Sequence, residues 1–175
     1  MNNPLKPFAE FAPIYRDLGY WPRPLLGKKC LESGWQKPNN ELPDGTLERW
    51  IEEKPSHNIG LVAGSSFSDG TRLGFLDIDH DNFIKLGKVL LDNPICVRYG
   101  QKGVVIPFRY VDGFNTKKKM KTKAEFEIED VAEVFLKNCY CAIPPSIHPK
   151  TSQPYYWEGP ALHKMDYKLL PLIGE

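Results

Sequence analysis

Apolar residues recur at three- and four-residue spacing in three stretches of the chain, and each stretch ends at a residue that stops helices. Gly19 ends the first, Pro55 the second and the pair Asn93-Pro94 the third. Thr46, at the start of the second stretch, is typical of a helix N-cap. The pattern predicts helices over residues 8–18, 46–54 and 83–91.

Shorter apolar runs bounded by glycine, proline and polar residues predict strands. They lie at 58–64, 73–79, 95–99, 104–110, 124–128, 140–143 and, more weakly, 155–157. Two prolines allow residues 20–26 to form an edge strand at most. The polar stretch 65–71 is typical of a hairpin turn, so the strands before and after it are expected to lie side by side. The order of elements indicates an α+β fold, with a mixed or antiparallel sheet and helices packed on one side.

The strand predicted at 73–79 ends in acidic residues spaced two apart. Alternation along a strand places Phe75, Asp77 and Asp79 on one face, so both carboxylates point the same way. Carboxylate oxygens at that spacing suit a hard divalent cation such as Mg²⁺ or Mn²⁺. An acidic turn at a strand end is an equally good interpretation of Asp-x-Asp alone. A calcium-binding loop is excluded, because its sixth position would be Asn82 and not glycine.

Composition is that of a globular protein of one domain, with 175 residues, 41% apolar and 26% charged. No apolar run approaches the roughly 20 residues that cross a bilayer, and the N-terminus lacks the apolar core of a signal peptide. We therefore expect a cytoplasmic protein without a membrane partner. The four cysteines form no Cys-x-x-Cys pair and are expected to be buried free thiols. A net charge of +1 excludes a strongly basic nucleic-acid binder, so any DNA contact must come from a local patch.

A basic patch is present as five lysines within residues 117–123, where a hairpin loop is expected. A solvated loop is the ordinary interpretation of such a run. The alternative is contact with the backbone of a nucleic acid, where each neutralised phosphate adds affinity and salt dependence. The DNA-binding candidates are Lys117, Lys118, Lys119 and Lys121.

Four blocks of the sequence together resemble the N-terminal primase-polymerase domain of phage and plasmid replication proteins, a branch of the archaeo-eukaryotic primase superfamily. The most specific block is Pro-Pro-Ser-Ile-His-Pro at 144–149, followed by Tyr-Tyr-Trp at 155–157. The other blocks are 19–24 with 27–29 and 34–35, then 58–64, and Leu-Asp-Ile-Asp at 76–79. The resemblance covers the chain from residue 15 to residue 160.

The resemblance implies a primase-like catalytic core, similar to the RRM fold, and two bound cations, Mg²⁺ or Mn²⁺. In that family the paired acids, here Asp77 and Asp79, and a third acid on a later strand are the catalytic metal ligands. By position the third falls at Glu125 or Glu127. We choose Glu127, because it is an acid followed by an aliphatic residue before the Pro-Pro-Ser block; Glu125, on the same face, is the alternative.

The chain departs from the superfamily where a Ser-x-His contacts the phosphates of the incoming nucleotide. No histidine occurs between His80 and His148. Basic groups can take its place, because lysine and arginine also hold phosphate oxygens. The proline-rich turn at 144–149 can hold side chains beside the sheet, although such a turn is more often only a bend. The nucleotide-binding candidates are Lys28, Lys102, Arg109, Ser146 and His148.

These features predict a metal-dependent nucleotidyltransferase, a DNA primase/polymerase that acts in phage or plasmid replication inside a prokaryotic cell. Its expected partners are a DNA template and primer, a dNTP or NTP, and a fused or associated helicase. Residues 1–175 would then be one domain, either the front end of a larger helicase-primase or a separate gene product. The alternatives are a catalytically degenerate primase-like module that binds single-stranded DNA, and another Asp-x-Asp metal enzyme such as a nuclease or a nucleotide-sugar transferase.

Overall fold

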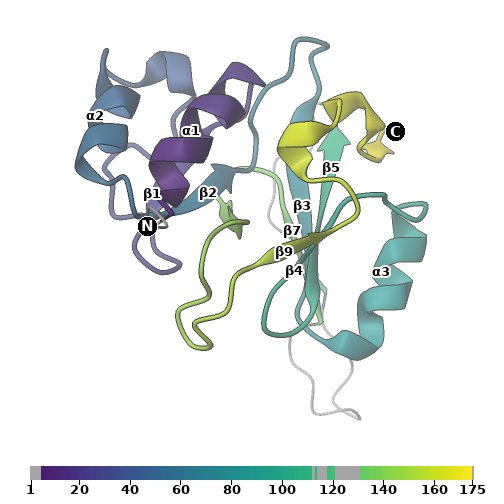
Figure 1. The fold of residues 1–175 in the computed structure, drawn as a ribbon. Helices are drawn as coiled ribbons and strands as arrows, with labels where there is room; N and C mark the ends of the chain where they lie inside the picture. The colour runs from purple at the N-terminus through teal and green to yellow at the C-terminus, as the bar shows by residue number, and fades with distance from the viewer. Residues whose placement is uncertain (1–4, 112, 114–117, 121–130, 175) are drawn as a thin grey trace.

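The computed structural model describes residues 5–111, 113, 118–120 and 131–174 of the chain. In this part of the chain the strands form two sheets with helices around them (Figure 1). The smaller sheet is antiparallel and has the order β1 (Pro22–Leu25), β2 (Asn58–Val62), β8 (Tyr140–Ile143). The larger sheet has the order β6 (Lys118–Met120), β7 (Ala132–Phe135), β3 (Arg72–Ile78), β5 (Val104–Tyr110), β4 (Val97–Tyr99), β9 (Tyr156–Glu158), and β10 (Leu172–Ile173) pairs in parallel with β5.

Strand β3 lies in the middle of the larger sheet, antiparallel to β5 on one side and to β7 on the other. Successive side chains of a strand point to opposite faces. Leu73 and Phe75 accordingly belong to one hydrophobic core, while Leu76 and Ile78 belong to another. Asp77 continues the face of Leu73 and Phe75, beyond the point where that core ends.

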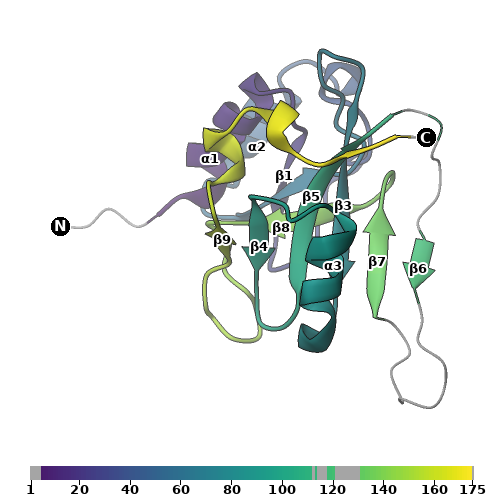
Figure 2. The same ribbon diagram turned by 90° about the vertical axis from the view of Figure 1, so that its right-hand side faces the viewer.

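One core lies between the larger sheet and α3 (Ile84–Leu90). Figure 2 shows α3 in front of β3 and β5. A Cβ added at Gly87 would lie 2.2 Å from Cδ1 of Ile78 and 3.7 Å from Cδ1 of Ile106. Glycine at this position therefore lets α3 approach the sheet closely.

The other core lies on the opposite face of the larger sheet. There Leu73 and Phe75 pack with residues of the smaller sheet, of α1 (Pro7–Asp17) and of α2 (Thr46–Glu53). Figure 1 shows these elements and α3 on opposite sides of β3 and β5. The prediction of helices on one side of the sheet is therefore wrong, because β3 is apolar on both faces and both faces are covered.

The predicted α+β class and antiparallel pairing are confirmed. The hairpin turn at 65–71 is also present, since Gly64 N donates to Leu73 O (2.7 Å) and Leu73 N donates to Ser65 O (2.9 Å). Beyond the turn, however, the two strands separate. β2 pairs with β1 and β8, while β3 pairs with β5 and β7. The prediction that they lie side by side is wrong, and it missed the division into two sheets.

The three predicted helices correspond to α1, α2 and α3. Thr46 is buried and is not the cap of α2; the N-cap is Gly45, whose φ is +72°. Short 3₁₀ turns occur at Asn39–Glu41 (η1), Asp81–Phe83 (η2), Leu162–Lys164 (η4) and Tyr167–Leu169 (η5). Within the described residues, no helix is long and apolar enough to span a membrane.

The predicted strands correspond to β1, β2, β3, β4, β5, β8 and β9, with ends that differ by a few residues. The strand predicted at 124–128 lies outside the described residues. The sequence analysis missed β6, β7 and β10. The lysine run is not entirely a loop, because the backbone of Lys118 and Lys119 forms an edge strand on β7, a position where lysine is common. All four cysteines are free thiols as predicted, although Cys30 and Cys139 are only half-buried.

Gly103 joins the β4–β5 turn to the end of β3. Its φ is +57°, its N–H donates to Oδ1 of Asp81 (2.7 Å), and a Cβ there would lie 1.7 Å from the carbonyl oxygen of Ile78. Gly103→Ala should therefore lower the free energy of unfolding by about 3 kcal/mol or more, as measured by urea denaturation.

Gly70 provides the matched control, because its φ is +83° but a Cβ there would meet nothing within 4 Å. Gly70→Ala introduces the backbone strain without the collision, and should cost about 1–2 kcal/mol. Equal losses in the two variants would show that the β4–β5 turn does not press against β3.

Candidate active site

Asp77 and Asp79 line one cavity, at the end of β3 where the two sheets meet. Its volume is about 160 Å³. The other lining residues come from the turn after β1, from β4 and the turn that follows it, and from the segment between β8 and β9. The full set is Lys28, Asp77, Asp79, Arg98, Gln101, Lys102, His148, Lys150 and Tyr155. We call this space the Asp77 cavity.

The register of β3 holds Asp77 at this cavity. Asp77 lies directly opposite Val105 of β5 and Glu133 of β7, and such cross-strand partners share one face of a sheet. Burial raises the pKa of the Asp77 carboxyl to about 6, and the positive charge of Arg98 opposes that shift. The negative charges of Asp79 and Glu133 raise the pKa further. Ionised Asp77 therefore gains from any cation that enters the cavity.

Glu133 is an acid of this region that the sequence analysis missed. The glutamates considered there, Glu125 and Glu127, lie outside the described residues. The signal that favours Glu127, an acid followed by an aliphatic residue ahead of the Pro-Pro-Ser block, fits Glu133-Val134 equally well and closer to that block. Because β7 is not predicted, the sequence pattern does not draw attention to this glutamate.

The chemistry of the cavity suits a hard divalent cation. Asp77 and Asp79 offer carboxylate oxygens, and Glu133 stands opposite Asp77 on the neighbouring strand. Among the described residues, no three His, Cys, Asp or Glu side chains already converge as a complete metal site. The cavity thus offers two acidic ligands and a third acid nearby. Mg²⁺ usually takes its other ligands from water and from substrate phosphates.

Lys28 reaches the cavity because Asn58 clamps two turns together. The Asn58 side-chain amide donates to Gly27 O (2.8 Å) and to Ile147 O (2.7 Å), and its oxygen accepts from Ile147 N (2.9 Å). Gly27 has a φ of +62° and packs against Pro149, the residue after His148. The Gly-Lys turn and the Pro-Pro-Ser turn lie far apart in the sequence, and Asn58 fixes them side by side.

His148 is 4% exposed and lies at the wall of the cavity. Burial, and then the positive charges of Lys28, Lys150 and Arg98, lower the pKa of the imidazole, so it is neutral at pH 7. Its Nδ1 accepts from Lys150 N (3.3 Å), which leaves the ring proton on Nε2. Neutral His148 can therefore donate one hydrogen bond from Nε2 to an anionic ligand.

Arg98 is a second functional candidate that the sequence analysis missed. It is 9% exposed, its Nη2 donates to Sγ of Cys141 (3.3 Å), and its guanidinium lies 4.8 Å from the centre of the Tyr155 ring. Its neighbours in the cavity include Lys102, which the sequence analysis does name. An arginine near a glycine-rich turn at a strand end is the signal that could have found it.

Two predicted nucleotide contacts are not brought to the cavity. The Ser146 hydroxyl accepts from Ile59 N (2.8 Å) and donates to Ile59 O (2.9 Å), so it is used in joining its turn to β2. Arg109 lies opposite Leu73, near the other end of β3, where it donates to Oδ2 of Asp69 (3.0 Å) and to the carbonyl oxygen of residue 168 (2.9 Å). We therefore remove Ser146 and Arg109 from the candidate site.

The predicted DNA-binding lysines are only partly described. Lys117 and Lys121 lie outside the described residues. Lys118 and Lys119 belong to β6, where Lys119 lies opposite Glu133 of β7. In the larger sheet, β7, the strand that carries Glu133, therefore lies between this edge strand and β3. Contact of these lysines with DNA stays a prediction.

The family described as bifunctional DNA primase/polymerase, N-terminal, matches residues 12–171. The match includes the smaller sheet, every strand of the larger sheet except β10, and every residue that lines the Asp77 cavity. A search of curated proteins found no match.

The raised pKa of Asp77 predicts how the stability of the metal-free protein depends on pH. An acid whose pKa is higher in the folded state binds more protons there, so stability falls as the pH rises from about 4 to about 6. Asp77→Asn removes this ionisation. In EDTA at pH 8 the variant should be more stable than the wild type by up to about 3 kcal/mol, and at pH 4 the difference should vanish.

Urea denaturation at the two pH values measures this difference. Glu158→Gln serves as the control, because Glu158 is exposed, is paired with Lys88 and does not line the cavity. A loss of stability in Asp77→Asn at pH 8 would mean that hydrogen bonds or ion pairs, rather than dehydration, dominate at this carboxylate.

Proposed function

The chain belongs to the family of bifunctional DNA primase/polymerase N-terminal domains, and we propose that the Asp77 cavity is its nucleotidyltransferase site. The observation that carries the proposal is the pairing of opposite charges in one cavity. Asp77 and Asp79 line it together with Lys28, Arg98 and Lys102. Acidic groups suit divalent cations, and basic groups suit the triphosphate that the cations accompany.

The reaction is the addition of a nucleotide to the 3′ end of a primer on a DNA template. The 3′-hydroxyl oxygen forms a bond to the α-phosphorus, the bond from that phosphorus to the β-phosphate oxygen breaks, and pyrophosphate leaves while the hydroxyl proton passes to solvent. Mg²⁺ or Mn²⁺ held by Asp77 and Asp79 would lower the pKa of the hydroxyl and neutralise charge on the triphosphate. The protein contributes mainly positioning and electrostatic stabilisation.

The acidic side of the cavity would hold the cations. Asp77 and Asp79 are the proposed ligands from β3, and Glu133 is the proposed third acid because its register places it opposite Asp77. Glu127 is the third acid that the family resemblance suggests from sequence position. The two glutamates can be separated by mutation.

The basic side of the cavity would hold the triphosphate. Lys28 and Lys102 are exposed cations at its mouth, whereas Arg98 is a buried one in its wall. Neutral His148 adds a donor at Nε2, as argued above from its contact with Lys150 N. The two lysines and Arg98 thus supply positive charge, and His148 supplies an uncharged hydrogen-bond donor.

The wider setting of the reaction also belongs to the proposal. The resemblance to replication proteins of phages and plasmids supports a role in DNA replication inside a prokaryotic cell, together with a helicase. The lysines of the 117–123 run would hold the DNA backbone. Strong salt dependence of DNA binding, lost when these lysines are replaced, would support that assignment.

Removing the proposed metal ligands should abolish activity. Asp77→Ala, Asp79→Ala and Glu133→Gln should each lower kcat for Mn²⁺-dependent dNTP incorporation on a primed template by about 10²-fold or more, because each removes charge that holds the cations. Extension of a labelled primer measures the rate, and Glu158→Gln is the matched acid control on the same sheet.

The variants Glu127→Gln and Glu125→Gln complete this test. If Glu133→Gln is fully active and Glu127→Gln is not, the third acid is the one that the family resemblance suggests. Full activity of Asp77→Ala would contradict the nucleotidyltransferase site itself. A wild-type protein that binds single-stranded DNA but incorporates no nucleotide would instead be a non-catalytic primase-like module.

Removing the proposed triphosphate contacts should weaken substrate binding more than it slows chemistry. Lys28→Ala and Lys102→Ala should each raise the KM for dNTP by about tenfold, because a hydrogen bond to a charged group is lost. Arg109→Gln is the control: its guanidinium is bound to Asp69, so the KM should stay within twofold. A large rise of KM in Arg109→Gln alone would instead show that Arg109 contacts the nucleotide.

A further inference from the structure

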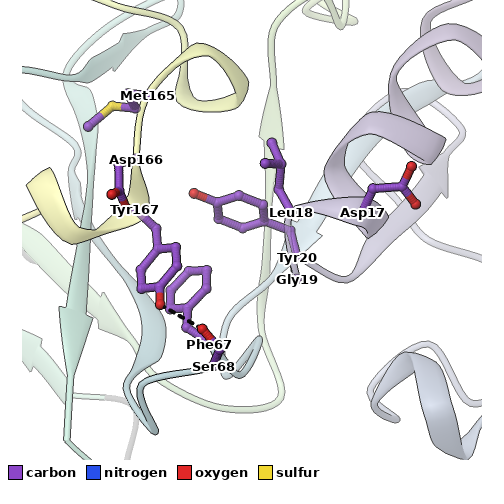
Figure 3. A pocket seen from close by; sticks show the side chains of 9 residues that line it. All are labelled: Asp17, Leu18, Gly19, Tyr20, Phe67, Ser68, Met165, Asp166 and Tyr167. Atoms are coloured by element: carbon purple, nitrogen blue, oxygen red, sulfur yellow. Dashed lines mark hydrogen bonds between the residues drawn. The ribbon is translucent and has the colours of Figure 1, made fainter.

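A second cavity lies near the start of β3, away from the Asp77 cavity (Figure 3). Its volume is about 420 Å³, which is within the range of small-ligand pockets. It is lined by residues 17–20 at the end of α1 and just after it, 67–68 in the β2–β3 turn and 165–167 in the C-terminal segment. β3 has seven residues, so the two cavities are separated by about 20 Å along the strand. We call this second space the Tyr20 cavity.

Tyr20 brings an unused polar group to this cavity. Its side chain is 1% exposed, and within the described residues its hydroxyl has no hydrogen-bond partner. Figure 3 shows the hydroxyl directed across the cavity toward the segment that carries Asp166. Leaving such a group unsatisfied costs about 1–3 kcal/mol. The hydroxyl of Tyr15, whose ring packs edge-on against Tyr20, differs in that it is bonded to Nδ1 of His163 (3.3 Å).

Among the described residues, the charged side chains that line this cavity, Asp17 and Asp166, are acidic. Burial first, then Cys96 and Asp166, raise the pKa of the Tyr20 hydroxyl, so Asp166 is close enough for its charge to act there. Asp17 also lies on the rim, but its carboxylate pairs with Arg16 (2.9 Å). No lysine or arginine is among the described residues that line the cavity. A phosphate ligand is therefore disfavoured here, in contrast to the Asp77 cavity.

Aromatic rings form one wall of the cavity. Phe67 and Tyr167 are stacked with their ring centres 4.2 Å apart, and the Tyr167 hydroxyl is bonded to Oγ of Ser68 (3.0 Å), as the dashed line in Figure 3 shows. Tyr20 packs edge-on against Phe67. Aromatic faces attract flat cations, and arginine more often than lysine.

We propose that the Tyr20 cavity is a docking site for an arginine side chain of a partner protein. A guanidinium carries several N–H donors in a rigid fork, so it can donate to the Tyr20 hydroxyl oxygen and to the Asp166 carboxylate together. Its flat face is of the kind that the Arg109 guanidinium already presents to the Tyr167 ring, 5.9 Å from the ring centre. Asp166 already accepts a hydrogen bond from Lys168 N (2.9 Å) through Oδ1, and a guanidinium would add the opposite charge that this backbone donor does not bring. A nucleotide would bring negative charge to a cavity that two carboxylates line. The proposal does not depend on the nucleotidyltransferase assignment.

The test uses the isotopically labelled full chain and the backbone NMR signals of Gly19, Ser68 and Tyr167. The probe is N-acetyl-arginine amide, and its neutral isostere N-acetyl-citrulline amide is the matched ligand. The arginine probe should shift these signals saturably, and the citrulline probe should bind at least about tenfold more weakly. Tyr20→Phe and Asp166→Asn should each weaken arginine binding by about tenfold.

Tyr15→Phe is the control variant, because it removes a buried hydroxyl next to the cavity that already has a partner. It should leave arginine binding unchanged. The proposal is overturned if the arginine probe shifts none of these signals, if citrulline binds equally well, or if Tyr20→Phe binds as tightly as the wild type. Shifts caused by adenosine instead would assign the cavity to a nucleobase, and dimerisation that depends on Tyr20 would assign it to a second copy; both results also overturn the proposal.

Discussion

The burial of β3 on both faces is the constraint on which the rest of the structure depends. A slip of one residue against β5 or β7 would turn Leu73 and Phe75 toward α3 and would drive Asp77 into the apolar core around Ile106. Burying an unpaired carboxylate there costs several kcal/mol, so that register is excluded. The apolar residues of β3 therefore determine where Asp77 lies. The interactions of the Asp77 side chain itself are not needed to fix its position.

The basic side of the Asp77 cavity depends on hydrogen bonds that do not touch the cavity. Ser146 uses its hydroxyl on the backbone of Ile59, and Asn58 bridges the turns that carry Lys28 and His148. These bonds join the smaller sheet to its turns and so set the position of two candidate ligands relative to Asp77. A serine of the Pro-Pro-Ser block can thus be required for nucleotide binding without contacting a nucleotide.

Local patterns in the sequence predicted what local interactions decide. A continuous or periodic apolar pattern lies within each of α1, α3 and β5, and residues that stop helices follow α1 and α3. The ends predicted for these elements are nearly correct. Pairing between distant segments was missed, because no pattern near 65–71 records that β2 leaves to join β8. β7 is short and carries a charge, so Glu133 went unnoticed. Arg109 was misplaced because the sequence does not show that Asp69 competes for it.

The two cavities differ in charge and are separated by β3, which has consequences for how their ligands can influence each other. At physiological salt, charges about 20 Å apart on the solvent side are largely screened, because the Debye length is about 8 Å. Influence would then have to pass through the packing of β3. That strand is held by cores on both faces, and close-packed interiors resist small displacements. A partner bound at the Tyr20 cavity would therefore tether the domain and leave the Asp77 cavity unchanged.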